Sequence, residues 1–155
     1  MTTYGPGDGP APSVLTDEEV SKLIEETTFG VLATVKRSGH PHMSTVVFSW
    51  DEKERIVRVS TTADRLKVRQ LRNDPRASLY VSSDDHMAFG VAEGTAELSE
   101  VAAEAGDAVS RELLDMLGDF SDPADEAAFL EQMVKDRRVV IRLRVERLYG
   151  TSLLK

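Results

Sequence analysis

The chain has 155 residues, of which 41% are hydrophobic and 30% charged, a composition typical of one globular domain with a buried core. Its formal net charge of -8 argues against nucleic acid or an anionic membrane as a partner, and no apolar run reaches the ~20 residues of a membrane helix. The absence of cysteine excludes disulfides and thiolate chemistry, and it indicates a reducing, cytoplasmic location.

The first residues predict a tail followed by a helix. Residues 1–13 are rich in glycine and proline and offer little to bury, so we expect a disordered N-terminal tail. Thr16 and Glu19 then have the spacing of a capping box, and an apolar stripe follows. We expect a short helix that ends at about Glu26.

Most of the remaining chain has the pattern of a β-sheet. Runs rich in apolar and β-branched residues, bounded by turn residues, predict strands over residues 29–35, 42–50, 56–62, 77–82, 87–98 and 141–146. Gly90 and Gly94 in the fifth run predict a bulge or a close backbone approach. The last run alternates Ile141, Leu143 and Val145 with charged residues, and we expect it to close or edge the sheet.

Three further helices are predicted. One runs from Arg65 to Arg72, capped by Asp64 and stopped by the proline that follows Asp74. Two more lie around residues 109–117 and 129–134, where apolar residues recur at helical spacing among many carboxylates. We expect this pair to pack on the sheet with the carboxylates in solvent.

The segment from Arg55 to Arg76 is basic, although the whole chain is acidic. It holds seven basic and two acidic residues. A strand that ends in Ser60, Thr61 and Thr62 and leads into a helix offers hydroxyls, amides and a dipole to a phosphate, with Arg65 and Lys67 adding charge. Gln70, three residues after Lys67, shares its helix face. Spacing alone leaves open a second interpretation, an exposed basic helix that compensates for acidic surfaces.

Other polar clusters predict no chemistry. His40 and His42 flank a proline in a predicted turn, with no third metal ligand near in sequence, so we predict no metal site. The sequence Asp84-Asp85-His86 is typical of a solvent-facing turn. No nucleophile, zinc-protease or P-loop motif is present, and we predict no catalytic protein residue.

The order of these segments resembles a known family. The strings FGVLATV, VAEGTAEL and RVERLYG, and above all S-x-x-x-D-R-x-K-x-x-x-L-R-x-D-P-R from Ser60 to Arg76, resemble the pyridoxamine 5'-phosphate oxidase-like flavin-binding proteins. More narrowly, the chain resembles their actinobacterial branch of enzymes that depend on coenzyme F-420, a deazaflavin. The resemblance covers Phe29 to Gly150 and implies a mainly β (α+β) fold, a six-stranded split β-barrel of the FMN-binding type with peripheral helices. Residues 14–155 would form this one domain.

The resemblance also implies the site. The family pairs two subunits in a homodimer with cofactor clefts between them. Arg65 and Lys67 match positions that hold the cofactor phosphate, Ser60 and Thr61 match the strand end beside it, and Gln70 would support the tail. The backbone of Val46, Val47 and Phe48 would border the ring. Met87 stands where a close branch carries tryptophan near the cofactor.

The implied function is an oxidoreductase that uses F-420, with FMN as the alternative, to transfer hydride to or from a small unsaturated or quinone-like molecule. A second function stays open. The protein would then bind such a cofactor for storage or sensing without turnover. Oxidation of vitamin B6 is disfavoured, because residues 147–150 match the substrate-binding C-terminal segment of true oxidases only faintly.

Overall fold

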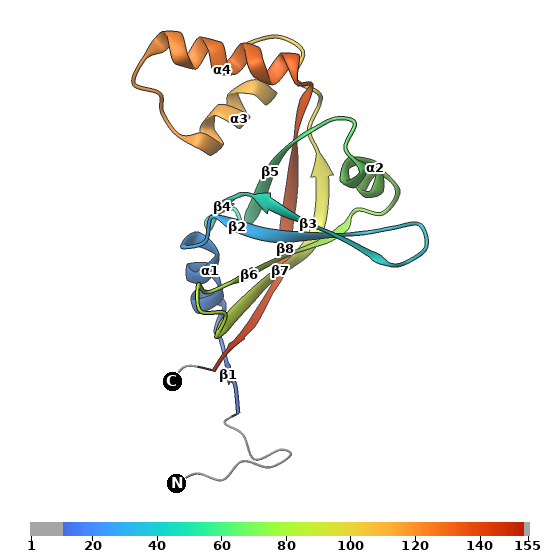
Figure 1. Cartoon of the computed structure of the whole chain (residues 1–155), viewed down its shortest axis with the longest axis vertical. Coiled ribbons are helices and arrows are strands. Elements are labelled where there is room, and N and C mark those ends of the chain that lie inside the picture. The colour runs from blue at the N-terminus through green and yellow to red at the C-terminus, as the bar shows by residue number, and fades with distance from the viewer. Residues whose placement is uncertain (1–10, 154–155) are drawn as a thin grey trace.

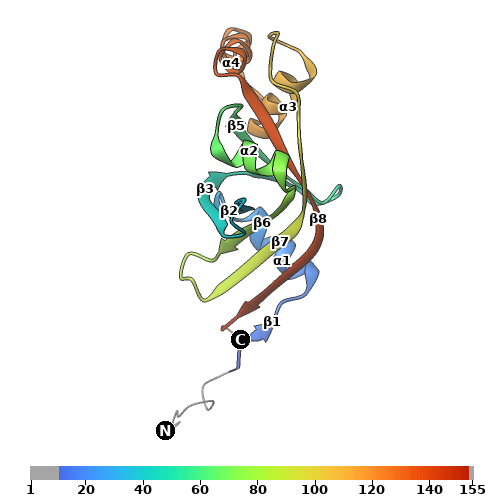
Figure 2. The ribbon, with the colours of Figure 1, turned by 90° about the vertical axis from the view of Figure 1, so that its right-hand side faces the viewer.

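The computed structural model describes residues 11–153, which form one curled antiparallel sheet with helices at its ends (Figures 1 and 2). The strands within this range are β1 (Ser13–Val14), β2 (Phe29–Val35), β3 (Pro41–Val47), β4 (Ser49–Asp51), β5 (Ile56–Thr62), β6 (Arg76–Ser82), β7 (Ala88–Leu98) and β8 (Arg138–Ser152). Because β1 and β4 have only two and three residues, six long strands remain, as predicted for the split barrel.

The strand order explains why the sheet curls into a barrel. Seven strands follow the order β3-β2-β6-β7-β8-β5-β4, and β1 pairs with β8 beside them. The two ends of this order, β3 and β4, are consecutive in the chain and are separated only by Phe48. The sheet must therefore bend until its ends meet. No strand pairing joins β3 to β5 within residues 11–153, so the barrel is split there.

The longest strand, β8, lies inside the sheet. It pairs with β7 on one side and with β5 on the other, so the prediction of a possible edge strand is wrong and that of a closing strand holds. Its side chains Ile141 and Leu143 are buried in the barrel. The predicted bulge is confirmed at Gly94, where the register shifts and any Cβ atom would overlap the carbonyl oxygen of Arg144.

The first helix closes one end of the barrel. Helix α1 (Asp17–Glu25) begins with the predicted capping box, in which the Thr16 hydroxyl and the Glu19 carboxylate bind each other's backbone amides. Its apolar stripe buries Val20 and Ile24 completely in the main core. Residues 1–10 of the predicted tail lie outside the described residues. Ser13 was also predicted in the tail, but it belongs to β1 and pairs with β8.

The last two helices form a separate layer. Helices α3 (Ala108–Leu117) and α4 (Pro123–Lys135) make a hairpin at the end of the sheet opposite β1 (Figure 1). Val109, Leu113 and Met133 build a second small core there with Val140 of β8. The prediction that the two helices pack on the sheet is confirmed. None of the helices in residues 11–153 combines the length and apolarity of a membrane span.

Candidate functional site

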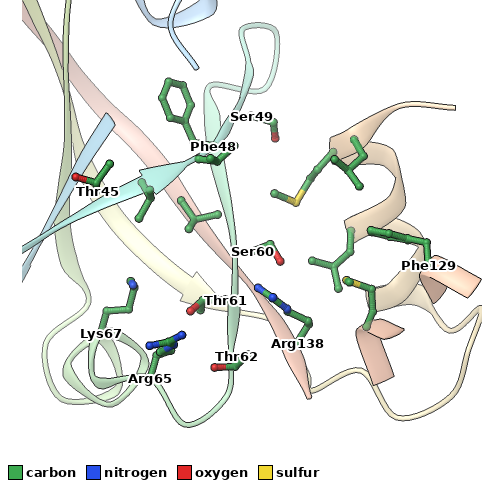
Figure 3. A pocket seen from close by; sticks show the side chains of 17 residues that line it. Thr45, Phe48, Ser49, Ser60, Thr61, Thr62, Arg65, Lys67, Phe129 and Arg138 are labelled. Atoms are coloured by element: carbon green, nitrogen blue, oxygen red, sulfur yellow. The ribbon is translucent and has the colours of Figure 1, made fainter. Parts of the chain in front are cut away.

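A cavity of about 580 Å³ opens at the split between β3 and β5 (Figure 3). The ends of these strands form one side, and the α3–α4 hairpin forms the other. The size falls within the ~300 to 1,000 Å³ of small-molecule sites. Its lining comprises residues 45–49 and 59–62 with Arg65, Lys67, Leu113, Met116, Leu117, Phe129, Met133 and Arg138.

One end of the cavity carries hydroxyl groups and positive charge. Strand β5 ends in Ser60, Thr61 and Thr62, and a turn leads directly to α2 (Leu66–Asn73). The side chains of Arg65 and Lys67 project from the start of this helix toward the same end of the cavity (Figure 3). The strand-turn-helix arrangement predicted from the sequence therefore brings these groups together.

The start of α2 differs from the prediction in one respect. Asp64 does not cap it, because the N-cap position is Arg65 and no side chain caps the first turn. The Asp64 carboxylate instead accepts a 2.8 Å hydrogen bond from the Thr62 hydroxyl, which lowers the pKa of Asp64. The positive end of the helix dipole is thus left without a side-chain acceptor, which favours binding of an anion.

The two cations at this end are without an ion pair in the described part of the chain. Neither Arg65 nor Lys67 forms an ion pair with a carboxylate of residues 11–153. Burial, and secondly the charge of Arg65, lowers the pKa of Lys67. An anion such as a phosphate fits this set of donors, because two cations, hydroxyls and an uncapped helix end all favour negative charge.

Seven of the nine predicted cofactor-binding residues line this one cavity: Val46, Val47, Phe48, Ser60, Thr61, Arg65 and Lys67. The other two lie elsewhere. The Gln70 side-chain oxygen accepts a 2.6 Å hydrogen bond from the Thr34 hydroxyl, and this residue borders a separate groove. Met87 precedes β7, is 38% exposed and does not line the cavity.

Sequence reasoning missed the helical side of the cavity. Leu113, Met116 and Leu117 recur at the spacing of an apolar helix face, and such a face looks the same whether it covers a core or a cavity. Arg138 was also missed. It lines the middle of the cavity and pairs with Asp136 at 3.3 Å. Nothing in the order of residues near Arg138 separates it from a surface arginine.

The remaining polar clusters have structural roles. In the predicted turn, Asp85 accepts hydrogen bonds from the Ser83 hydroxyl and from the Met87 amide, as expected for a capping aspartate. His42, predicted to begin a strand directly after the turn, lies within β3, where its Nδ1 atom is buried without a hydrogen-bond partner among residues 11–153. In that same range, no three His, Asp or Glu side chains are grouped to hold a metal ion.

Comparisons with known proteins agree with this fold. The sequence model of the pyridoxamine 5'-phosphate oxidase family matches residues 16–152. A conserved hypothetical protein, Rv2991 from Mycobacterium tuberculosis, is 22% identical with a TM-score of 0.69, over 90% of this chain and 86% of that one. An F420 reductase is 26% identical with a TM-score of 0.58, over 83% and 94%. An FMN-binding protein from Nostoc punctiforme PCC 73102 is 16% identical with a TM-score of 0.62, over 87% and 79%.

Proposed function

The chain belongs to the pyridoxamine 5'-phosphate oxidase family, and from this premise we propose that it is an oxidoreductase that binds coenzyme F-420 at the split of its barrel. The family includes oxidoreductases and proteins that bind flavins. The choice of F-420 over FMN is supported by the likeness to an F420 reductase, at 26% identity over most of both chains. FMN is the competing cofactor.

The observation that carries the proposal is a pair of cations that form no ion pair within residues 11–153. Arg65 and Lys67 would hold the phosphate of the cofactor, since both line the cavity and neither forms an ion pair with a carboxylate of residues 11–153. Ser60 and Thr61, at the end of β5, would donate hydrogen bonds beside it. A phosphate bound beside Lys67 would form an ion pair with it, and this pair would raise the pKa of Lys67 back toward its usual value.

Residues 46–48, at the end of β3, would position the ring of the cofactor. Val46, Val47 and Phe48 line the cavity where the strand pairing stops, so their backbone groups can face a planar ligand. When bound, the cofactor supplies the hydride chemistry, and the protein supplies position and electrostatics. Gln70 and Met87 do not line the cavity as one chain builds it, and the Gln70 side chain binds Thr34.

A homodimer forms part of the proposal. The outer face of β2, β3 and β6 exposes large apolar side chains, with Phe29 and Met43 each 62% exposed and Val47 57% exposed. The register places Phe29 beside Val47, and Tyr80 lies opposite Val31 on the same sheet. Several large exposed apolar side chains on one face of a sheet are typical of a protein interface. Because Val47 also lines the cavity, a second subunit there would border the site.

Titration of the purified protein with F-420 and with FMN, followed by fluorescence, tests the proposal. We expect submicromolar binding of F-420 and much weaker binding of FMN. The double variant Arg65→Ala, Lys67→Ala should lose roughly 3 to 6 kcal/mol of binding free energy, because each charge-assisted contact contributes about 1.5 to 3 kcal/mol. Its far-UV circular dichroism should match that of the parent.

The matched control is Arg69→Ala with Arg72→Ala, which removes two exposed arginines of the same helix that do not line the cavity. This control should bind F-420 nearly as well as the parent. Equal affinity in the two double variants would refute the phosphate assignment. Absence of binding of either cofactor to the parent would refute the proposed function.

A further inference from the structure

The helical side of the cavity is apolar. Leu113, Met116 and Leu117 of α3 and Phe129 and Met133 of α4 line it. In Figure 3 Phe129 faces Ser60 and Arg138 across the cavity, while Arg65 and Lys67 lie at the far side of those two residues. We refer to the five lining residues of α3 and α4 as the apolar wall. The cavity thus has a charged end and an uncharged side.

Part of the apolar wall remains uncovered. Two of its members, Leu113 and Met133, are also buried in the small core, but Leu117 is 66% exposed and Met116 and Phe129 are half-buried. Leu117 is the last residue of α3, and Gly118 turns the chain away with a φ of 100°. Apolar area left in a cavity of small-molecule size is free to be covered by a ligand, and each buried Å² then contributes about 25 cal/mol.

The wall excludes charged groups. It contains no acidic or basic side chain, and Arg138, the nearest cation that lines the cavity, is already paired with Asp136 at 3.3 Å. A charged ligand group placed against the wall would lose its hydration without gaining a counter-ion. An uncharged group loses nothing comparable.

The wall is held in place before any ligand arrives. Glu112, which precedes Leu113, accepts a 2.9 Å hydrogen bond from Arg58 Nε of β5 and a 2.8 Å hydrogen bond from Arg142 Nε of β8. These contacts tie α3 to β5 and β8, which contribute residues 59–62 and Arg138 to the lining of the cavity. A preformed surface binds with less loss of conformational entropy than one that must order on binding.

We infer that the apolar wall is the binding site for an uncharged, apolar ring or hydrocarbon compound, bound next to the anion held by Arg65 and Lys67. The inference rests on the proposed function only in taking this compound as the substrate of the oxidoreductase. Charged substrates, such as phosphorylated vitamers or carboxylic acids, are thereby excluded from the wall.

The test uses N-phenyl-1-naphthylamine, an uncharged fluorophore whose emission rises in apolar surroundings, with the full-length protein without cofactor. We expect saturable binding at one site per chain. Leu117→Glu should weaken it about tenfold or more, because it places a carboxylate on the wall. The matched control Leu153→Glu changes an apolar side chain that is 48% exposed and far from the cavity, and it should bind like the parent.

The outcomes separate this inference from the proposed function. Absence of saturable fluorophore binding, or equal affinity in Leu117→Glu and the parent, would overturn the inference; a wall covered by a second copy of the chain would give the first of these results. If the fluorophore binds as expected while F-420 does not bind, the apolar site stands and the proposed cofactor falls. The Arg65→Ala, Lys67→Ala variant should keep its fluorophore affinity.

Discussion

Two groups of basic residues on neighbouring elements have opposite surroundings. Arg58 on β5 and Arg142 and Arg144 on β8 each pair with at least one carboxylate, whereas Arg65 and Lys67 at the start of α2 pair with none in residues 11–153. Ser60, only two residues after Arg58 on β5, already belongs to the cavity. The first group, which we call the paired arginines, stabilises the fold, and the second is available to a ligand.

The pKa shifts of the two groups express the same difference. The hydrogen bonds of Arg142 are the main reason that the pKa of Glu112 is lowered, so the fold favours the charged form of this carboxylate. Burial is the main reason that the pKa of Lys67 is lowered, so the fold disfavours its charged form. A bound ligand of opposite charge can stabilise a charge that the fold alone disfavours. Groups of this kind therefore cluster at functional sites.

Replacement of a paired arginine should have the largest effect on stability. Arg142→Met leaves Glu112, whose side chain is 19% exposed, with Arg58 alone, and it leaves Glu97 with Arg144 alone. We expect a loss of about 1 to 3 kcal/mol in the free energy of unfolding, between the values for exposed and for buried ion pairs. Urea denaturation at pH 7 measures it.

The control for this change is Arg37→Met. Arg37 is exposed in the turn between β2 and β3 and has no ion pair among the described residues, so its loss should stay within about 0.5 kcal/mol. Equal losses in the two variants would mean that the paired arginines contribute no more to stability than a solvated surface charge.

A pH titration of stability sharpens the comparison. The folded-state pKa of Glu112 lies below its usual 4.5, so its contribution is fully present above that value and is lost as pH falls through the lowered pKa. Glu112→Gln should therefore cost about 1 to 2 kcal/mol at pH 7, and the difference from the parent should shrink below about pH 4.5. Denaturation curves at pH 7, 5 and 3 measure this difference.

Glu131→Gln provides the matched control, because Glu131 is exposed on α4 and has no ion pair in residues 11–153. Its difference from the parent should be near zero at all three pH values. If the difference in unfolding free energy between Glu112→Gln and the parent stayed constant from pH 7 to pH 3, the contacts of Glu112 with Arg58 and Arg142 would not depend on its charge.

The sequence predicted the charged end of the cavity because its signals are local. Hydroxyls at a strand end, a helix start and two cations lie within the eight residues from Ser60 to Lys67, and the family motif covers the same stretch. The strands were predictable for a similar reason, since period-two patterns and turn residues act over short distances. That the barrel is split followed only from the family resemblance, which did not say between which strands.

The paired arginines and the apolar wall were not predictable, because their partners are distant in sequence. Arg58 and Glu112 are 54 residues apart, and Arg142 and Glu112 are 30 apart. The carboxylates of α3 were interpreted as a solvated face, which is correct for Asp115 and wrong for Glu112, which points toward the sheet. Periodicity assigns a residue to a helix face but does not say what lies opposite that face.

The smallest expected effect has the opposite sign. Lys67→Met removes a charge whose burial the fold disfavours, so it should raise the free energy of unfolding at pH 7, while Lys53→Met, an exposed turn residue, should change little. Because the folded-state pKa of Lys67 lies below its usual 10.5, the unfolded chain binds more protons in the window between the two values. The unfolding free energy of the parent therefore rises as pH rises through this window, and the advantage of Lys67→Met becomes smaller. Urea denaturation at pH 7 and pH 10 measures the difference, and a loss of stability in Lys67→Met at pH 7 would mean that Lys67 has a structural partner after all.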